Sequence, residues 1–446
     1  MGEWDSCNAK NLVRILKCFE LCSGLKVNLS KSRLMGLSVS CEEVRDLARW
    51  LKCKEDSLPF KYLGLPVGGK MSNVSSWQPI IDKVKKRLST WKTKSLSIGG
   101  RLCLCKAVLG SLSTYFFSLY SAPKKVLLTL ESLRRRFFLG EVESSKRINW
   151  VAWNKTLRNK ESGGLGIGSL HALNLAMLRK WWWREKTEPD NIWTKIIRSC
   201  SGDNPRKSGE VWRGIKSIET QLSGVGINLN SLFQRKNDEW VWPLDPSSKY
   251  TVSSLRKLID CTMLPQADQE TFWIKWVTNK VNVHLWRTLI NRLPTLDNLH
   301  ARGVQLPSIG CYLCNAKSES LDHVFTDCSS ARLISAHLSL WTDWWSVNET
   351  TVSGLWLSID QGSSNKVRRL VKKLIAAAFF WILWKQRNDK AFGRAIKKEK
   401  EKCEKIQFVA FNWIKHRAKF GKILSWESWC SNPINAVTLC CALAPR

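Results

Sequence analysis

The sequence predicts a mainly α-helical protein with small α+β parts. Apolar residues recur at helical spacing over much of the 446-residue chain. One stretch, residues 311–328, has the Cys and His spacing of a zinc-binding module. The chain also carries 71 Lys and Arg against 37 Asp and Glu, a formal net charge of +34 at pH 7. So large an excess of one sign repels itself unless a polyanion compensates it, which favours a nucleic-acid partner.

The first part of the chain has an α+β pattern. An apolar residue every three or four positions over residues 11–22 predicts a helix. Residues 25–30 alternate between apolar and polar, as a half-buried strand does. Ser40 and Glu43 have the spacing of a capping box, which predicts a second helix that runs to about Lys52.

Residues 70–188 form a helical pattern that is rich in basic residues, here called the basic helical block. One predicted helix has Pro79 in its first turn, and others cover residues 101–119, 124–138 and 170–186. Between residues 81 and 186 there are 22 Lys or Arg and only 6 Asp or Glu.

These charges have two interpretations. A solvated helix face is the usual place for any single lysine, whereas the block as a whole favours contact with nucleic-acid phosphates. The candidate contact residues are Lys83, Lys85, Lys86, Arg87, Arg101, Lys106, Lys124, Lys125, Arg134, Arg135 and Arg136.

The glycine-rich run at residues 163–168 lacks the Lys-Ser/Thr pair of a phosphate-binding loop, so it is interpreted as a flexible entry to the helix that follows. The tryptophans at 181–183 are expected in a core with a partly exposed rim. Glycine, serine and proline become more frequent over residues 204–226 and the helical periodicity fades, which predicts a linker or a domain boundary. Two short strands are predicted at residues 240–242 and 249–252.

The clearest candidate site is the array Cys311, Cys314, His323 and Cys328. Zn²⁺ takes four sulfur or nitrogen ligands in a tetrahedron, and two cysteines two residues apart can bind one ion from a single turn. Three thiolates and one imidazole leave no open position, which predicts a structural zinc site. Chance is the alternative, since the chain has 16 cysteines, but the other close pairs lack a following His and Cys.

Helices around the array supply its expected core. One is predicted through Trp276, a second over residues 283–289, and a short third that begins at Thr295 and ends at Gly303. His284 and His300 lie nearby in the sequence and are expected to be hydrogen-bonded or exposed rather than ligands.

The tail, residues 341–446, is predicted to be helical and basic. Residues 366–422 contain 18 basic and 4 acidic side chains in a helical pattern that is interrupted at Gly393. Such a helix can also lie on a membrane surface or meet a partner helix. The longest apolar run, residues 374–384, is too short to cross a bilayer. With no apolar signal segment at the amino end, the protein is expected in the nucleus or cytoplasm.

An ordered series of motifs resembles the reverse transcriptase of plant non-LTR (LINE-type) retrotransposons, downstream of its catalytic palm motif, and extends to about residue 340. The motifs are SGLKVNLSKS from residue 23, FKYLGLPVG from 60, WKTKSLSIGGRLCLCKAVLGSLSTY from 91, ESGGLGIGSL from 161, FWIKWVTNKVNVHLWRTLINRLPT from 272, and the Cys/His array.

The resemblance implies that the chain has five parts. It also implies that the partners are RNA and DNA, which act as template and primer. The parts are the end of the palm (1–69), a thumb-like nucleic-acid grip (70–188), a connector (189–246), a reverse transcriptase zinc-binding domain (247–340) and the basic helical tail (341–446). An upstream palm or polyprotein portion is a further expected partner.

One departure from the family bears on catalysis. Such polymerases hold their metal ions with an Asp-Asp turn, and no Asp-Asp pair occurs in this sequence. We therefore expect no catalytic residues in this chain, no polymerisation by it alone, and a role for Mg²⁺ only if a palm is supplied. The alternative is a stand-alone basic nucleic-acid-binding or scaffold protein with a structural zinc site.

Overall fold

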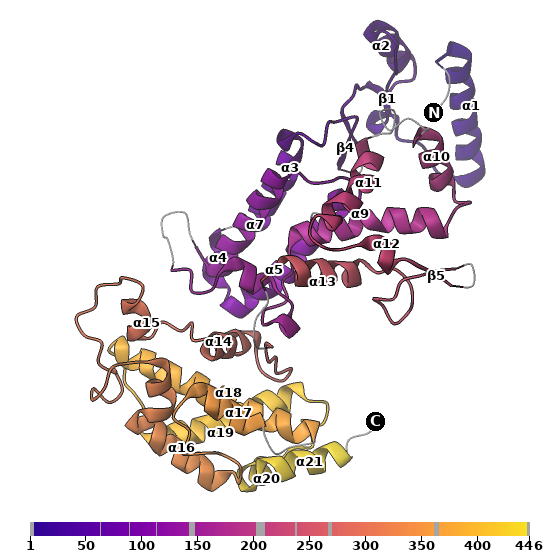
Figure 1. Cartoon of the computed structure of the whole chain (residues 1–446). Helices are drawn as coiled ribbons and strands as arrows, with labels where there is room; N and C mark the ends of the chain where they lie inside the picture. Colours follow the sequence, from indigo (N-terminus) through magenta and orange to yellow (C-terminus); the bar gives the residue numbers. More distant parts are fainter. Residues whose placement is uncertain are drawn as a thin grey trace. The chain divides into compact units, whose positions relative to one another are not determined.

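The computed structural model describes residues 4–62, 64–88, 90–112, 114–141, 148–201, 210–236, 239–265, 270–360 and 365–443. It confirms the mainly α-helical fold with small β parts, because the strands of the described residues form three two-stranded sheets. The chain divides into two compact units, Met1–Pro79 and Ile80–Arg446. Figure 1 labels most of the helices and some of the strands.

The first unit begins with two helices whose ends follow local signals. Helix α1, Ser6–Ser23, starts after Asp5 and ends at Gly24, which has a left-handed backbone with φ +70°. Helix α2, Cys41–Trp50, confirms the predicted capping box. The Ser40 hydroxyl accepts the Glu43 backbone N–H and donates to the Glu43 carboxylate.

The predicted strand over residues 25–30 is wrong. These residues form an irregular segment that ends in the 3₁₀ turn η1, Leu29–Lys31, and no strand pairs with them. The strands of this unit follow later. Strand β1, Arg33–Leu34, pairs in parallel with β2, Lys54–Glu55, and β3, Phe60–Tyr62, pairs in antiparallel fashion with β4, Leu65–Val67. A 3₁₀ turn, η2, covers Val74–Trp77.

The helices predicted in the basic helical block are present. The long one predicted from residue 101 is divided into α5 and α6, and α7 ends as predicted at Gly140, which has φ +77°. The elements are α3 (Gln78–Arg87), α4 (Thr90–Ser95), α5 (Ile98–Leu112), α6 (Thr114–Phe117), α7 (Lys124–Leu139), α8 (Trp153–Leu157), η3 (Lys160–Ser162) and α9 (Leu170–Thr187).

The glycine-rich run is close-packed, so its interpretation as a flexible entry is wrong. The backbone N–H groups of Leu165, Gly166 and Gly168 donate to carbonyls of residues 156–158. A Cβ atom added at Gly164 would lie 2.2 Å from the carbonyl oxygen of Arg158. Glycine is needed here because two backbone segments approach each other too closely for a side chain.

Helices α9, α11 and α13 share one core. Trp183 is buried in it while Trp181 and Trp182 lie at its edge, as predicted. The other elements are α10 (Ile192–Ser201), α11 (Glu210–Ser223), α12 (Leu229–Leu232), β5 (Gln234–Lys236), β6 (Glu239–Val241) and α13 (Val252–Met263).

Two predictions for this region are wrong. The linker predicted over residues 204–226 contains α11, whose Trp212, Ile215 and Ile218 are buried at helical spacing. Residues 204–209 of that linker lie outside the described residues. The second predicted strand is also absent, because β6 pairs with β5 and Val252 begins α13.

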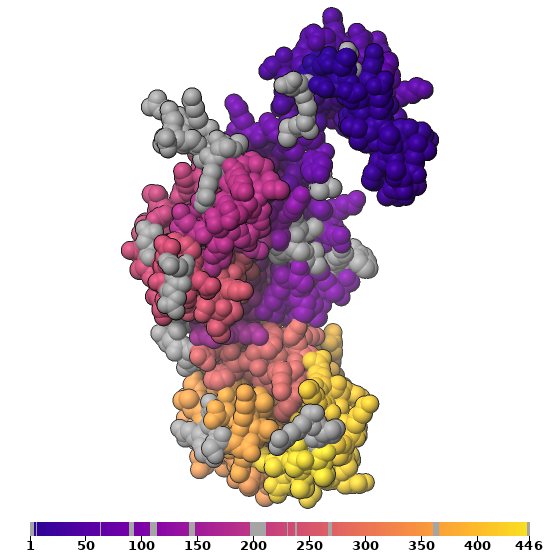
Figure 2. Space-filling model, turned by 90° about the vertical axis from the view of Figure 1, so that its right-hand side faces the viewer, coloured from indigo at the N-terminus to yellow at the C-terminus, as the bar shows by residue number. Residues whose placement is uncertain are grey.

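The Cys/His array and the tail contribute to one hydrophobic cluster, which runs from Ile274 to Cys440. Its elements are α14 (Asn279–Leu289), α15 (Leu296–His300), η4 (His323–Asp327), α16 (Ser329–Trp341), α17 (Val352–Asp360), α18 (Lys366–Ala391), α19 (Glu399–Arg417), α20 (Trp426–Ser431) and α21 (Pro433–Leu443). In the space-filling view these orange to yellow segments are in continuous contact (Figure 2).

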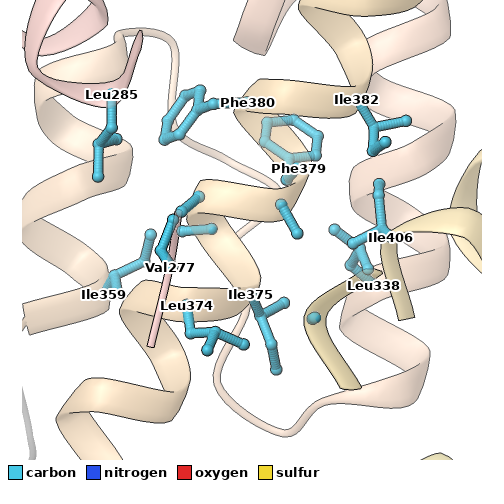
Figure 3. Packing of buried hydrophobic residues seen from close by; sticks show 14 of the residues in the cluster. Val277, Leu285, Leu338, Ile359, Leu374, Ile375, Phe379, Phe380, Ile382 and Ile406 are labelled. Carbon is cyan, nitrogen blue, oxygen red and sulfur yellow. The ribbon is translucent and has the colours of Figure 1, made fainter. Parts of the chain in front are cut away.

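Helix α18 is the centre of this cluster and packs against α14, α17, α19 and α21. Figure 3 shows its Leu374, Ile375 and Phe379 among side chains of α14, α17, α16 and α19. The apolar run at residues 374–384 is therefore the inside of a helical module. Within the described residues, no helix combines the length and the hydropathy that a bilayer crossing requires.

The helix predicted through Trp276 is wrong, whereas α14 and α15 are present where helices were predicted. Residues 271–277 form a non-helical segment that the Asn282 side chain holds in place. Its amide donates to the carbonyls of Ile274 and Val277 and accepts the Ile274 N–H.

Substitution of Gly164 by alanine tests the packed turn. Gly164→Ala should destabilise the protein by about 1–3 kcal/mol, because the new methyl group meets backbone that cannot rotate away. The matched control is Gly224→Ala, whose Cβ would lie 3.5 Å from its nearest neighbour and should change stability by less than about 1 kcal/mol. Thermal unfolding measures both, and equal effects would contradict the close approach.

Candidate metal centre

Cys311 and Cys314 lie on a tight turn of the zinc loop, defined here as residues 311–328. The Cys311 N–H donates to the Lys317 carbonyl at 2.8 Å, and Asn315 has a left-handed backbone with φ +55°. The N–H of Leu313 donates to the sulfur of Cys311 at 3.4 Å, and that of Ala316 to the sulfur of Cys314 at 3.5 Å. Backbone donors directed at sulfur stabilise thiolates, the form that binds metal.

His323 and Cys328 come from the other end of the loop. His323 begins the single π-helical turn η4, and Cys328 is the N-cap residue of α16. A helix N-terminus favours a negatively charged thiolate. The pKa of Cys328 is lowered, first by the hydrogen bond from the Cys311 thiol and further by the Ser330 and Ala331 amides. The pKa of Cys311 is raised, first by that same bond and then by burial.

The structure brings all four side chains together as a Cys/His cluster. One ligand atom from each lies within 4.8 Å of the other three, and the Cys314 sulfur is 3.2 Å from Nε2 of His323. Zinc–sulfur bonds of about 2.3 Å in a tetrahedron put sulfur atoms about 3.8 Å apart. The donor set and the separations therefore fit zinc, and a closed set of four protein ligands fits a structural role.

A carboxylate lies behind the histidine. Nδ1 of His323 lies 3.6 Å from Oδ2 of Asp327, which leaves Nε2 directed at the cluster. Asp327 is itself held by Lys317 and Arg332, each at 2.6 Å. The hydrogen bond from Lys317 is the largest cause of the lowered pKa of Asp327. A carboxylate behind a metal-binding histidine fixes its tautomer and ring orientation.

A buried ion pair joins the zinc loop to α18. The Glu319 carboxylate is fully buried and accepts Nε of Arg387 at 3.0 Å through both of its oxygens. It also accepts the backbone N–H groups of Leu296, at the start of α15, and of Tyr312, inside the loop. One turn further along α18, the Lys390 ammonium donates to the Leu313 carbonyl.

The sequence interpretation did not identify Asp327, Glu319 or Arg387. Asp327 follows His323 by four residues, a spacing that could have marked it as the carboxylate behind the ligand. Glu319 and Arg387 are 68 residues apart, and no local pattern pairs them.

The two additional histidines lie elsewhere. His284 is buried, and its Nε2 lies 3.3 Å from the Phe380 carbonyl. Burial lowers the pKa of His284 to about 3. His300 ends α15 and is exposed. Neither belongs to the Cys/His cluster.

The candidate nucleic-acid residues divide by exposure. Arg134 is 2% exposed, donates to the Gly168 carbonyl and pairs with Glu131 at 3.0 Å. Arg101 donates to the carbonyls of Phe138, Thr93 and Leu96. Lys106 is half-buried. The exposed candidates are Lys83, Lys85, Lys86, Arg87, Lys124, Lys125, Arg135 and Arg136.

The part of the chain that contains the metal centre matches a known family model. Residues 250–334 match the family described as zinc-binding in reverse transcriptase. The chain is 24% identical over 455 residues to a putative ribonuclease H protein of Arabidopsis thaliana, covering 81% of this chain and 71% of that protein. It is 32% identical over 90 residues to an uncharacterized mitochondrial protein of Arabidopsis thaliana, covering 20% of this chain and 58% of that protein.

These similarities support derivation from a retrotransposon. The similarity to the putative ribonuclease H protein covers 81% of this chain, whereas the family match is confined to the part that contains the Cys/His cluster. That cluster, within a zinc-binding family, can hold a metal ion.

Loss of one ligand tests the metal centre. The intact chain should contain one zinc ion by elemental analysis, and Cys314→Ser should lose it together with the fold of the zinc loop, because binding and folding are coupled. The matched control is Cys41→Ser, which removes an exposed thiol far along the sequence and should keep the zinc. A metal-free wild-type chain that is still folded would contradict the prediction.

Removal of one partner tests the buried ion pair. Arg387→Met should destabilise the protein by about 3–5 kcal/mol, because the Glu319 carboxylate is left buried and unpaired. The control is Arg394→Met, whose side chain is 72% exposed beside Asp389 and should cost less than about 1 kcal/mol. Denaturant unfolding of the zinc-loaded protein measures both. Equal losses would show that the buried pair is dispensable.

Proposed function

We propose that this chain is the carboxyl-terminal portion of the RNA-directed DNA polymerase of a plant LINE-type retrotransposon, and that it contributes template–primer binding and a structural zinc module. The observation that carries the proposal is the assembled Cys/His cluster inside a segment that matches the zinc-binding family of reverse transcriptases. The similarity to two Arabidopsis proteins supports it over a larger part of the chain. The nucleus or cytoplasm is the corresponding location.

The proposed nucleic-acid surface uses the exposed basic side chains of the basic helical block. Lys83, Lys85, Lys86 and Arg87 lie together on α3, and all four are exposed. Lys85 also lies 3.9 Å from the carboxylate of Asp82. Exposed cations of this kind bind phosphates through displacement of counterions, without sequence specificity.

Catalysis is not part of the proposal for this chain. Two aspartates side by side hold the catalytic metal ions in such polymerases, and the sequence has no Asp-Asp pair. Mg²⁺ would act only with a palm supplied by another polypeptide or by an upstream portion.

A stand-alone nucleic-acid-binding or scaffold protein is the second candidate. It is favoured by the single hydrophobic cluster that joins the zinc loop to the tail, because such a module has a large core of its own. The encoding transcript separates the two candidates. An upstream reading frame with an Asp-Asp turn would favour the polymerase, and an intact short message would favour the second candidate.

Charge removal on α3 tests the nucleic-acid surface. Combined substitution of Lys83, Lys85, Lys86 and Arg87 by glutamine should weaken binding to an RNA–DNA duplex. It should also make the dependence of log K on log salt shallower by about 0.9 for each phosphate that the variant no longer neutralises. Fluorescence anisotropy over a range of KCl concentrations measures both.

The matched control removes the same number of exposed charges from the tail, as glutamine substitutions of Lys397, Lys398, Lys400 and Lys405. Equal loss of affinity in the two variants would mean that net charge alone matters, which would contradict a surface on α3.

Primer extension tests the catalytic claim. The purified chain should extend no primer on an RNA template with Mg²⁺ or Mn²⁺, since it lacks the paired aspartates. Extension that survives repurification would overturn that claim and leave the binding proposal standing.

A further inference from the structure

Two lysines from different elements converge on one indole ring. The ammonium of Lys106, on α5, lies 5.6 Å from the ring centre of Trp273, and that of Lys160, in η3, lies 4.2 Å from it. The two ammonium groups therefore lie within about 10 Å of each other. This separation does not exceed the Debye length at 0.1 M salt, so the two charges repel each other. Both side chains are only partly exposed, so salt screens their repulsion incompletely.

The backbone fixes this arrangement. The Thr271 N–H donates to the Lys160 carbonyl at 2.7 Å, which holds the segment bearing Trp273 against η3. A Cβ atom at Gly166 would lie 3.5 Å from Nζ of Lys106, so the glycine-rich turn borders the pair. Trp273 also lies within the segment that matches the zinc-binding family, whereas both lysines lie in the basic helical block.

Neither ammonium has a direct acidic partner among the described residues, although burial lowers the pKa of Lys160 and the charge of Glu161 raises it in part. Neither forms an ion pair or a hydrogen bond there, and the nearby Glu161 carboxylate lies 3.7 Å from Lys257. The pKa of Lys106 is lowered to about 8, first by burial and then by the charge of Lys160. Burial is also the main cause of the lowered pKa of Lys160. A bound anion would relieve both the burial cost and the repulsion.

We propose that Lys106 and Lys160, over Trp273, form a binding site for one backbone phosphate of a nucleic acid. This inference rests on the proposed function and deepens it, because it names a specific contact between the basic helical block and the zinc-binding segment. The indole ring contacts both ammonium groups, and the phosphate supplies the negative charge that they lack nearby.

The competing explanation is that the two lysines only strengthen packing through cation–π contacts. Such contacts contribute about 0.5–1 kcal/mol at exposed sites, which stabilises the fold but binds no ligand. The two explanations differ in what a charge-removing variant does to binding. A shared phosphate also makes the two lysines interdependent, since removing either charge releases the phosphate.

The test uses the full zinc-loaded chain and a fluorescein-labelled RNA–DNA duplex. Lys106→Met and Lys160→Met keep the aliphatic stem over Trp273 and remove the charge. Each variant should make the slope of log K against log salt shallower by about 0.9. The double variant should lose little more affinity than either single variant does. Lys106→Arg keeps the charge and should retain most of the affinity.

The matched control is Lys405→Met, which removes an exposed lysine that lies 5.1 Å from the ring centre of Phe408. It should leave the slope unchanged. Unchanged affinity and slope in Lys106→Met and Lys160→Met would overturn the site, and strictly additive losses in the double variant would overturn the shared phosphate.

A second measurement separates this inference from the proposed function. Inorganic pyrophosphate should raise the thermal unfolding midpoint of the wild-type chain and should raise it less in Lys106→Met. A wild-type chain that binds no duplex but shows this shift would refute the proposed function and keep the anion site. If the wild-type chain binds the duplex but pyrophosphate shifts the unfolding midpoint equally in the wild-type chain and in Lys106→Met, the site alone is refuted.

Discussion

The buried pair of Glu319 and Arg387 is the interaction on which the metal module depends. A carboxylate with no exposed surface is tolerated only when its charge is compensated and its oxygens accept hydrogen bonds. Arg387 supplies the charge from α18, and the Leu296 and Tyr312 amides supply further donors from α15 and the zinc loop. Three segments that are distant in sequence must therefore assemble before Glu319 can be buried. Metal ligation and this ion pair thus act on the same loop.

Helix α18 can play this part because it is buried along most of its length. Apolar side chains cover every face from Val371 to Trp384, so no amphipathic pattern separates an inner from an outer side. Its charged residues are accommodated individually. The ammonium of Lys373 lies 3.8 Å from the ring centre of Phe272, and Lys372 lies 5.2 Å from that of Trp344. The tail is thus the interior of the module that contains the zinc loop.

Local signals in the sequence predicted the fold class, most helices and the set of clustered Cys and His side chains. The Ser40 capping box, Gly140 at the end of α7 and the spacing of Cys311 and Cys314 each act over a few residues, so a sequence pattern captures them. The failures concern long-range partners. Residues 25–30 alternate like a strand but pair with no strand among the described residues, and the glycines near 164 reflect close approach to Arg158 rather than flexibility. Glu319 and Arg387 are coupled only by the tertiary fold.

Basic residues in this chain serve two different purposes, and net charge does not distinguish them. Arg134 and Arg101 direct their guanidinium groups at backbone carbonyls, where a planar fork can bond several acceptors at once. A lysine offers a compact charge and could not replace that geometry. The basic side chains of α3 are instead exposed to solvent, where Lys85 lies 3.9 Å from Asp82. The exposed basic surface of this block is therefore smaller than the sequence suggests, and the candidate residues on it are mainly lysines.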